Sequence, residues 1–166
     1  MFCGCKKLIA TPELPATTLA ENCYNNMLCR CSITTAPQLP ATTLANRCYS
    51  MMFYGCNSLV EAPDLPALTL KSYCYGNMFE GCTSLEKAPV LPAVSLNGTY
   101  CYYYMFRNCS KLNYVKALFK TLPSTSYTTN WLSGVAASGT FVKSADATWS
   151  GTGVSMVPSG WTIVTE

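Results

Sequence analysis

Residues 52–77, MFYGCNSLVEAPDLPALTLKSYCYGN, are followed directly by residues 78–104, MFEGCTSLEKAPVLPAVSLNGTYCYYY. The two stretches share the frame M-F-x-G-C-x-S-L-x-x-A-P-x-L-P-A-x-x-L, followed by C-Y. Leu-Pro dipeptides at positions 14, 39, 65 and 91 show that the frame recurs at intervals of 25, 26 and 26 residues. A unit of this length is too small to bury its own apolar face and must stack on its neighbours. The sequence therefore predicts a repeat solenoid, in which one continuous buried column is formed by Leu8, Ile33, Leu59, Leu85 and Leu112.

Repeat units fill most of the chain. The first begins at Met1, and a fifth begins at Met105 and loses the pattern after Val115. Because Met1 occupies the frame position of Met52, we expect the chain to begin inside a repeat, as a fragment of a longer protein. Past Lys120, cysteine disappears while Thr, Ser, Gly and Trp become frequent. We therefore divide the chain into repeats over 1–120, about four and a half units with the N-terminal end truncated, and a C-terminal cap over 121–166.

Each unit contains two kinds of apolar spacing. Apolar residues three apart surround Pro63 and favour a short strand, whose pairing is restricted because proline has no N–H to donate. The next apolar residues follow at four-residue intervals, a spacing that places them on one face of a helix. In the third unit these residues are Leu70, Cys74, Met78 and Cys82. The predicted fold class is a leucine-rich-repeat horseshoe with one short strand and one helical stretch per repeat.

The repeat frame closely resembles the BspA-like leucine-rich repeats of bacterial surface proteins. The tail, with NWLSGV at 130–135, GTFVK at 139–143 and PSGWT at 158–162, is similar to the segment that often closes such arrays. The resemblance covers nearly the whole chain. It implies a secreted or surface-attached protein of gut or oral bacteria, with roles in binding host proteins, other cells or glycans. It brings no catalytic motif.

The tail also contains local signals of its own. Two stretches bounded by turn residues, Gly139–Lys143 and Gly160–Val164, are predicted to be strands. Ser124–Ser126 is predicted to cap a short helix that runs through Leu132. We expect the last repeat to be covered by large aromatic side chains, namely Trp131, Phe141 and Trp161.

The chain has 11 cysteines and no histidine. Nine cysteines occupy repeat-equivalent positions, in one column of Cys5, Cys31, Cys56, Cys82 and Cys109 and another of Cys23, Cys48, Cys74 and Cys101. We expect most of these to be reduced and buried, because free Cys behaves as a small apolar residue; disulfides between neighbouring rungs are the alternative. Cys3 and Cys29 break the pattern and are predicted to be the most exposed and oxidisable thiols. Without Cys-x-x-Cys or histidine, no metal site or other cofactor is predicted.

Composition also weighs against catalysis and nucleic-acid binding. The absence of histidine removes the commonest general base, and the repetition of the cysteines is unlike that of a nucleophile. A net charge of +3 with scattered Lys and Arg gives no basic stripe. No apolar run is long enough to span a membrane, so no membrane insertion by this fragment is expected. We therefore expect a protein that is not an enzyme.

Function is predicted to lie on the strand positions that differ between repeats. The residues expected to contact a ligand are Gln38, Glu61, Asp64, Lys87 and Tyr114. A column of tyrosines, Tyr24, Tyr49, Tyr75 and Tyr102, is interpreted as packing along the solenoid flank with hydroxyls in water, or alternatively as a platform for sugars.

The predicted function is a cell-surface or secreted binding or adhesion module, extracellular, with a protein or glycan ligand. The alternatives are a spacer that projects a missing domain and a recognition module at the tip of a phage or injection-system fibre. Self-association through the uncapped N-terminal end is a further expected contact.

Overall fold

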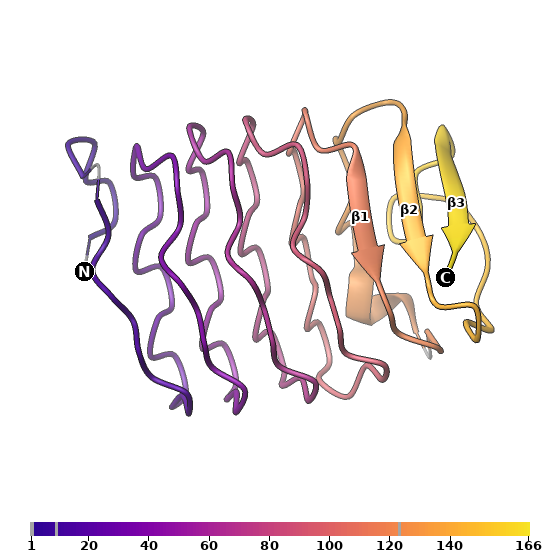
Figure 1. Ribbon diagram of the computed structural model, residues 1–166, viewed down its shortest axis with the longest axis horizontal. Helices are drawn as coiled ribbons and strands as arrows, with labels where there is room; N and C mark the ends of the chain where they lie inside the picture. Colours follow the sequence, from indigo (N-terminus) through magenta and orange to yellow (C-terminus); the bar gives the residue numbers. More distant parts are fainter. Residues whose placement is uncertain (1, 9, 123) are drawn as a thin grey trace.

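The computed structural model describes residues 2–8, 10–122 and 124–166, so Met1, where the first repeat is predicted to begin, lies outside them. The repeats form successive coils of one elongated stack, with the two termini at opposite ends (Figure 1). Regular elements lie only toward the C-terminal end of the described chain. They are β1 (Tyr114–Ala117), the 3-10 turn η1 (Thr125–Thr128), β2 (Gly139–Lys143) and β3 (Trp161–Thr165).

The three strands form one parallel sheet in the order β1-β2-β3. Val115 pairs with Phe141, and Phe141 pairs in turn with Ile163. Upstream of β1, the described residues on the same side of the coils form only isolated parallel bridges, namely Thr35 with Glu61, Lys87 with Tyr114 and Leu91 with Ala117. Prolines recur on this side and cannot donate to a ladder, which explains why extended strands do not form there. We call this side, formed by residues 10–14, 34–39, 60–65, 86–91 and 113–117, the strand face.

The predicted fold class, a leucine-rich-repeat horseshoe with one short strand and one helical stretch per repeat, was wrong. Among the described residues the only helical element is η1, and no repeat contains the helical stretch that a leucine-rich repeat needs. The segments with four-residue spacing are instead continuous runs of turns, at 21–30, 46–55, 72–81 and 99–108. We call this side of the stack the turn face.

Alternating hydrogen bonds explain why the turn face is not a helix. The N–H of Cys48 donates to Ala45 O within its own coil (3.4 Å), whereas the N–H of Tyr49 donates to Cys74 O on the next coil (3.0 Å). The pattern repeats along the run, so every second N–H leaves the coil and the i to i−4 ladder of an α-helix cannot form. Each coil is thereby joined to the next by backbone hydrogen bonds along its whole turn face.

Left-handed residues recur every fourth position on the turn face. In the second coil Arg47, Met51 and Gly55 have φ of 55°, 56° and 68°. A helix needs negative φ throughout, so these residues break it at each turn. Asn and Gly tolerate this conformation best, and they occupy many of the equivalent positions: Asn22, Asn26, Asn77, Gly81, Asn108, Asn130 and Gly134.

The core is a set of identical side chains stacked coil upon coil. Ile33, Leu59, Leu85 and Leu112 are fully buried, as predicted, while Leu8 at the N-terminal end is half-buried. Phe53, Phe79 and Phe106 stack in a parallel column, with ring centres 5.5 Å apart at each step. Successive coils therefore share one continuous core rather than having a core each.

The C-terminal segment extends this core. The strands predicted at 139–143 and 160–164 are present as β2 and β3, whereas the predicted helix ends early, at Thr128. Ser124 caps it, and its side chain accepts a hydrogen bond from the N–H of Ser126. The predicted covering residues Trp131, Phe141 and Trp161 are all buried, and so is Trp149.

Candidate functional surfaces

Three of the predicted ligand residues lie together on the strand face. Glu61, Asp64 and Lys87 line one shallow hollow of about 320 Å³ that spans two coils. Val60 and Val90 line it as well and are 52% and 43% exposed. The hollow therefore combines two carboxylates, one ammonium group and exposed aliphatic side chains.

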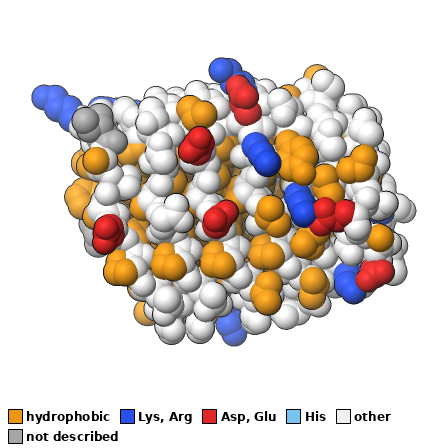
Figure 2. All heavy atoms as spheres, viewed as in Figure 1, with side chains coloured by type: hydrophobic (Ala, Val, Ile, Leu, Met, Phe, Trp, Pro, Cys, Tyr) orange, Lys and Arg blue, Asp and Glu red, His pale blue; other side chains and the backbone are white. Residues whose placement is uncertain are grey.

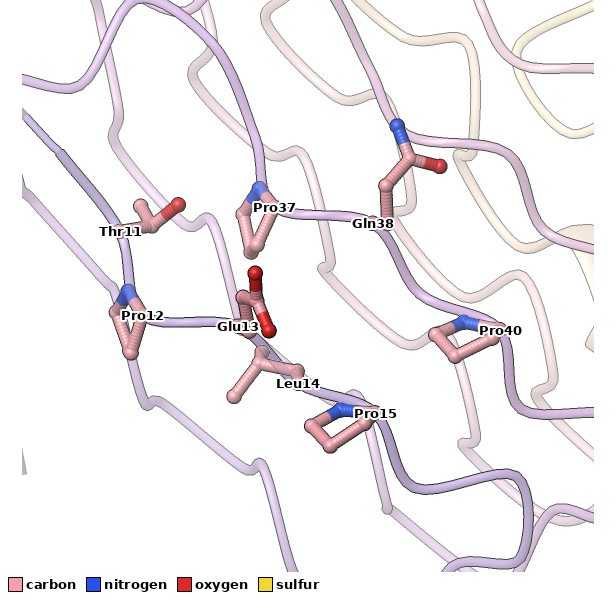
Figure 3. Close-up of a pocket in the computed structure, with 8 residues that line it drawn as sticks. All are labelled: Thr11, Pro12, Glu13, Leu14, Pro15, Pro37, Gln38 and Pro40. Carbon is pink, nitrogen blue, oxygen red and sulfur yellow. The ribbon is translucent and has the colours of Figure 1, made fainter.

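Tyr114 extends this hollow and Gln38 does not. The Nζ of Lys87 lies 5.0 Å from the centre of the Tyr114 ring, which is half-exposed on β1. A lysine over an aromatic face is held by attraction to the ring. Gln38 lies in a separate hollow toward the N-terminal end, which it shares with Glu13 and prolines of two successive coils (Figure 3). The structure thus brings four of the five predicted residues into one neighbourhood.

Figure 2 shows acidic and basic side chains spread over the visible face, together with rows of apolar side chains that run along the stack. The exposed acids on the strand face are Glu13, Glu61, Asp64 and Glu86, against the two lysines Lys87 and Lys116. The turn face carries three arginines, Arg30, Arg47 and Arg107, against the two acids Glu21 and Glu80. The two faces therefore differ in charge, although the chain as a whole is only weakly basic.

The tyrosine column packs along the stack as predicted, but its hydroxyls were assigned to the wrong environment. Tyr49, Tyr75 and Tyr102 are each 1% exposed and stack inside the core, 6.0 and 6.1 Å apart. Their hydroxyls do not point to water: those of Tyr49 and Tyr75 are buried and have no hydrogen-bond partner among the described residues. Burial also raises the pKa of both phenols. The column is a packing element and offers no platform to a sugar.

A different set of tyrosines reaches the surface of the turn face. Tyr73, Tyr100, Tyr103 and Tyr104 are half-exposed, and adjacent rings lie between 4.0 and 5.8 Å apart. We call these four residues the tyrosine cluster. Sequence reasoning missed it because Tyr103 and Tyr104 have no tyrosine at the equivalent positions of the preceding repeat, which are Gly76 and Asn77. The signal that could have located the cluster is the pair Tyr73 and Tyr100, which directly precede cysteines of the same column in successive repeats.

Most of the column cysteines are buried free thiols, as predicted. Those that are buried are Cys31, Cys48, Cys56, Cys74, Cys82, Cys101 and Cys109, whereas Cys5 and Cys23 are exposed near the N-terminal end. The first column also forms hydrogen bonds between coils, since the Sγ of Cys82 donates to Phe53 O at 3.2 Å and that of Cys109 to Phe79 O at 3.0 Å.

Burial keeps these thiols protonated. It raises the pKa of Cys48 and Cys56 to about 11 and that of Cys101 and Cys109 to about 12. Because the thiolate is the reactive and metal-binding form, the buried thiols are poor nucleophiles and poor ligands at neutral pH. No group of three His, Cys, Asp or Glu residues in the described parts of the chain is arranged to hold a metal ion.

Cys3 and Cys29, the pair predicted to be most oxidisable, are joined in a disulfide between the first two coils. Cys3 is exposed as predicted, but Cys29 is buried.

Comparisons with protein-family models, with curated proteins and with solved structures each found no match. The resemblance to BspA-like repeats therefore depends on the shared repeat frame alone. None of the helical residues that the structure describes forms a segment long and apolar enough to cross a membrane.

Proposed function

We propose that this chain is a non-enzymatic extracellular binding module that recognises a protein ligand through the strand face. The observation that carries the proposal is the hollow in which Glu61, Asp64 and Lys87 lie between exposed Val60 and Val90. Protein interfaces combine an apolar centre with charged and polar groups that fix orientation. With two carboxylates against one ammonium group, this hollow suits a basic or neutral surface patch of the partner.

The rest of the molecule supports a binding role. The buried positions are repeated from coil to coil, so they serve packing, while the residues that differ between coils lie outside. A shallow hollow of this kind gives modest affinity, which many copies at a surface would raise. The disulfide between Cys3 and Cys29 is compatible with an oxidising compartment outside the cytosol.

The test is a fourfold variant, Glu61→Ala, Asp64→Ala, Lys87→Ala and Tyr114→Ala, screened beside the unaltered protein on an array of extracellular proteins and glycans. The exposed residues Glu61, Asp64 and Lys87 should each shift the free energy of unfolding by only about 0.5 kcal/mol when they are replaced. A matched variant alters exposed residues outside the hollow, Glu21→Ala, Asn97→Ala and Lys7→Ala. The proposal predicts that the fourfold variant loses binding to the captured protein and that the matched variant keeps it.

Two results would contradict the proposal. If the fourfold variant remains folded and binds the captured protein normally, the strand face is not the binding surface. If the unaltered protein captures nothing, the function as a spacer is favoured.

A further inference from the structure

The tyrosine cluster is bordered by arginines stacked on its rings. The guanidinium of Arg47 lies 5.3 Å from the centre of the Tyr73 ring, and that of Arg107 lies 4.6 Å from Tyr104. A third pair on the same face, Arg30 over Tyr54, has a distance of 5.4 Å. Stacking holds the planar guanidinium in place and leaves its N–H groups free to donate sideways.

Because the rings are stacked, the groups that a ligand can contact here are the tyrosine hydroxyls and the arginine guanidinium groups. Tyr73 lies between Arg47 of the preceding coil and Tyr100 of the following coil, whose ring centre is 4.9 Å away. Its ring faces are therefore occupied and cannot stack on a sugar. Phenol oxygens can donate or accept hydrogen bonds, and guanidinium forks match carboxylate and sulfate oxygens in pairs.

A groove continues this surface toward the N-terminal end. It measures about 290 Å³, and its lining includes Lys6, Arg30, Tyr54 and Glu80. Gly81 also lines the groove, in the left-handed conformation at φ 75°, so no side chain covers the backbone there. The groove connects to the tyrosine cluster because Glu80 forms an ion pair with Arg107, at 3.4 Å, and Arg107 stacks on Tyr104.

The surface carries a net positive charge. Glu80 is the carboxylate that lines the groove, and it is 8% exposed and paired with Arg107. Within the described part of the chain, Arg30 and Arg47 form no ion pair with any carboxylate. Asn77 also donates to Glu80, through Nδ2. Two stacked guanidinium groups and Lys6 thus face solvent without a protein counter-charge.

We propose that this groove and the tyrosine cluster together bind an acidic polysaccharide, through its sulfate or carboxylate groups. Two features favour a polysaccharide over a protein partner. The donors lie along the stack, across coils that repeat at about 4.8 Å, which suits a linear chain. The surface is polar, and the exposed Val, Leu and Ile side chains lie on other segments, so the apolar centre of a protein interface is missing. The site lies on the turn face and is separate from the hollow on the strand face.

The test measures binding of heparin, polygalacturonate, polyglutamate and neutral dextran to the full chain at about 50 mM NaCl. The variant is Arg30→Asn with Arg47→Asn, because both residues are exposed and left-handed and Asn suits that conformation. The matched control, Lys7→Asn with Lys111→Asn, removes the same charge from exposed positions outside the groove. Urea unfolding of each protein checks that the fold is intact.

The proposal predicts binding to one or both acidic polymers and none to dextran, weakened about tenfold or more in the arginine variant and much less in the lysine control. Tighter binding of heparin would identify sulfate as the preferred group, and tighter binding of polygalacturonate would identify carboxylate. An equal loss of affinity in the arginine variant and the lysine control would mean that binding depends only on overall charge, which would overturn the assignment of the site. Absence of binding to both polymers, or equally tight binding of polyglutamate, would overturn the ligand class. These results do not test the strand-face proposal, because the fourfold variant used there keeps Arg30 and Arg47 and the arginine variant keeps the strand-face residues.

Discussion

Replacing Tyr75 by Phe is expected to stabilise this protein, although the same change costs stability at a hydrogen-bonded tyrosine. Tyr75 is 1% exposed and stacks between Tyr49 and Tyr102, at 6.0 and 6.1 Å. Its hydroxyl is buried and has no hydrogen-bond partner among the described residues. On folding, this hydroxyl therefore gives up its hydrogen bonds to water without forming one to the protein.

The magnitude follows from that missing partner. A buried unpaired hydroxyl costs about 1–3 kcal/mol. Phe keeps the ring stack and removes a single oxygen, so the cavity penalty is small compared with that of a larger deletion. We expect Tyr75→Phe to raise the free energy of unfolding by about 1–2 kcal/mol, which corresponds to a rise in Tm of about 2–8 °C at this chain length.

Urea unfolding followed by tryptophan fluorescence measures the difference, provided that the m-value is unchanged. The control is Tyr114→Phe, because the half-exposed Tyr114 can form hydrogen bonds with water; its effect should stay within about 0.5 kcal/mol. If Tyr75→Phe destabilises the protein by about 1 kcal/mol or more, the hydroxyl has a partner and the reasoning is refuted.

Three further changes have defined expected outcomes. Met51 has φ of 56°, and the equivalent positions are held by Asn26 and Asn77, the residue type that tolerates this conformation. Met51→Asn should therefore raise the free energy of unfolding by about 0.5–1 kcal/mol. A lower free energy of unfolding in a urea titration would show that Met51 stabilises the protein by packing instead. Burial raises the pKa of Cys101 and Cys109 from 9.0 to about 12, so the folded chain retains these protons at pH values where the unfolded chain loses them. Stability should therefore be level below about pH 9 and fall as pH rises toward 12, by roughly 1 kcal/mol for each thiol at pH 10. Urea midpoints that do not change between about pH 8 and 11 would contradict this. Replacing Cys3 and Cys29 by Ser removes a disulfide between residues 26 apart and should lower the free energy of unfolding by about 3 kcal/mol. If the unfolding curve under non-reducing conditions is unchanged by the double substitution, the disulfide does not form.

The repeat itself could be predicted from the sequence because each coil uses the same residues at the same depth. Leu59 and Leu85 were placed in one continuous column, and both are fully buried. The strands near the C-terminus were located for a similar reason, since Gly139 and Gly160 bound short β-rich stretches. Packing between equivalent positions imposes these features on the sequence directly.

The helix was predicted wrongly because two structures share the same spacing. Side chains four residues apart meet on one face of a helix, and they also meet when every fourth residue is left-handed and starts a new turn. Asn22, Asn26 and Asn77 distinguish the two, because Asn is enriched at positive φ and is unfavourable inside helices. The apolar spacing alone does not contain this information.

The candidate sites were predicted only in part. Glu61, Asp64 and Lys87 were found by asking which strand positions differ between repeats, and they do lie together. The tyrosine cluster was missed, because Tyr103 and Tyr104 stand where the preceding repeat has Gly76 and Asn77, so the repeat frame does not pair them with other tyrosines. The depth of the Tyr49 and Tyr75 column also depends on the path of the backbone, which the repeat frame does not specify.

The stack of turns is tested most directly by scalar couplings across backbone hydrogen bonds in a ¹⁵N,¹³C-labelled sample. The account predicts a coupling from the amide nitrogen of Tyr49 to the carbonyl carbon of Cys74, on the next coil, and one from Met51 to Gly76. Couplings from Tyr49 to Ala45 and from Met51 to Arg47, the partners four residues back that an α-helix requires, would contradict it.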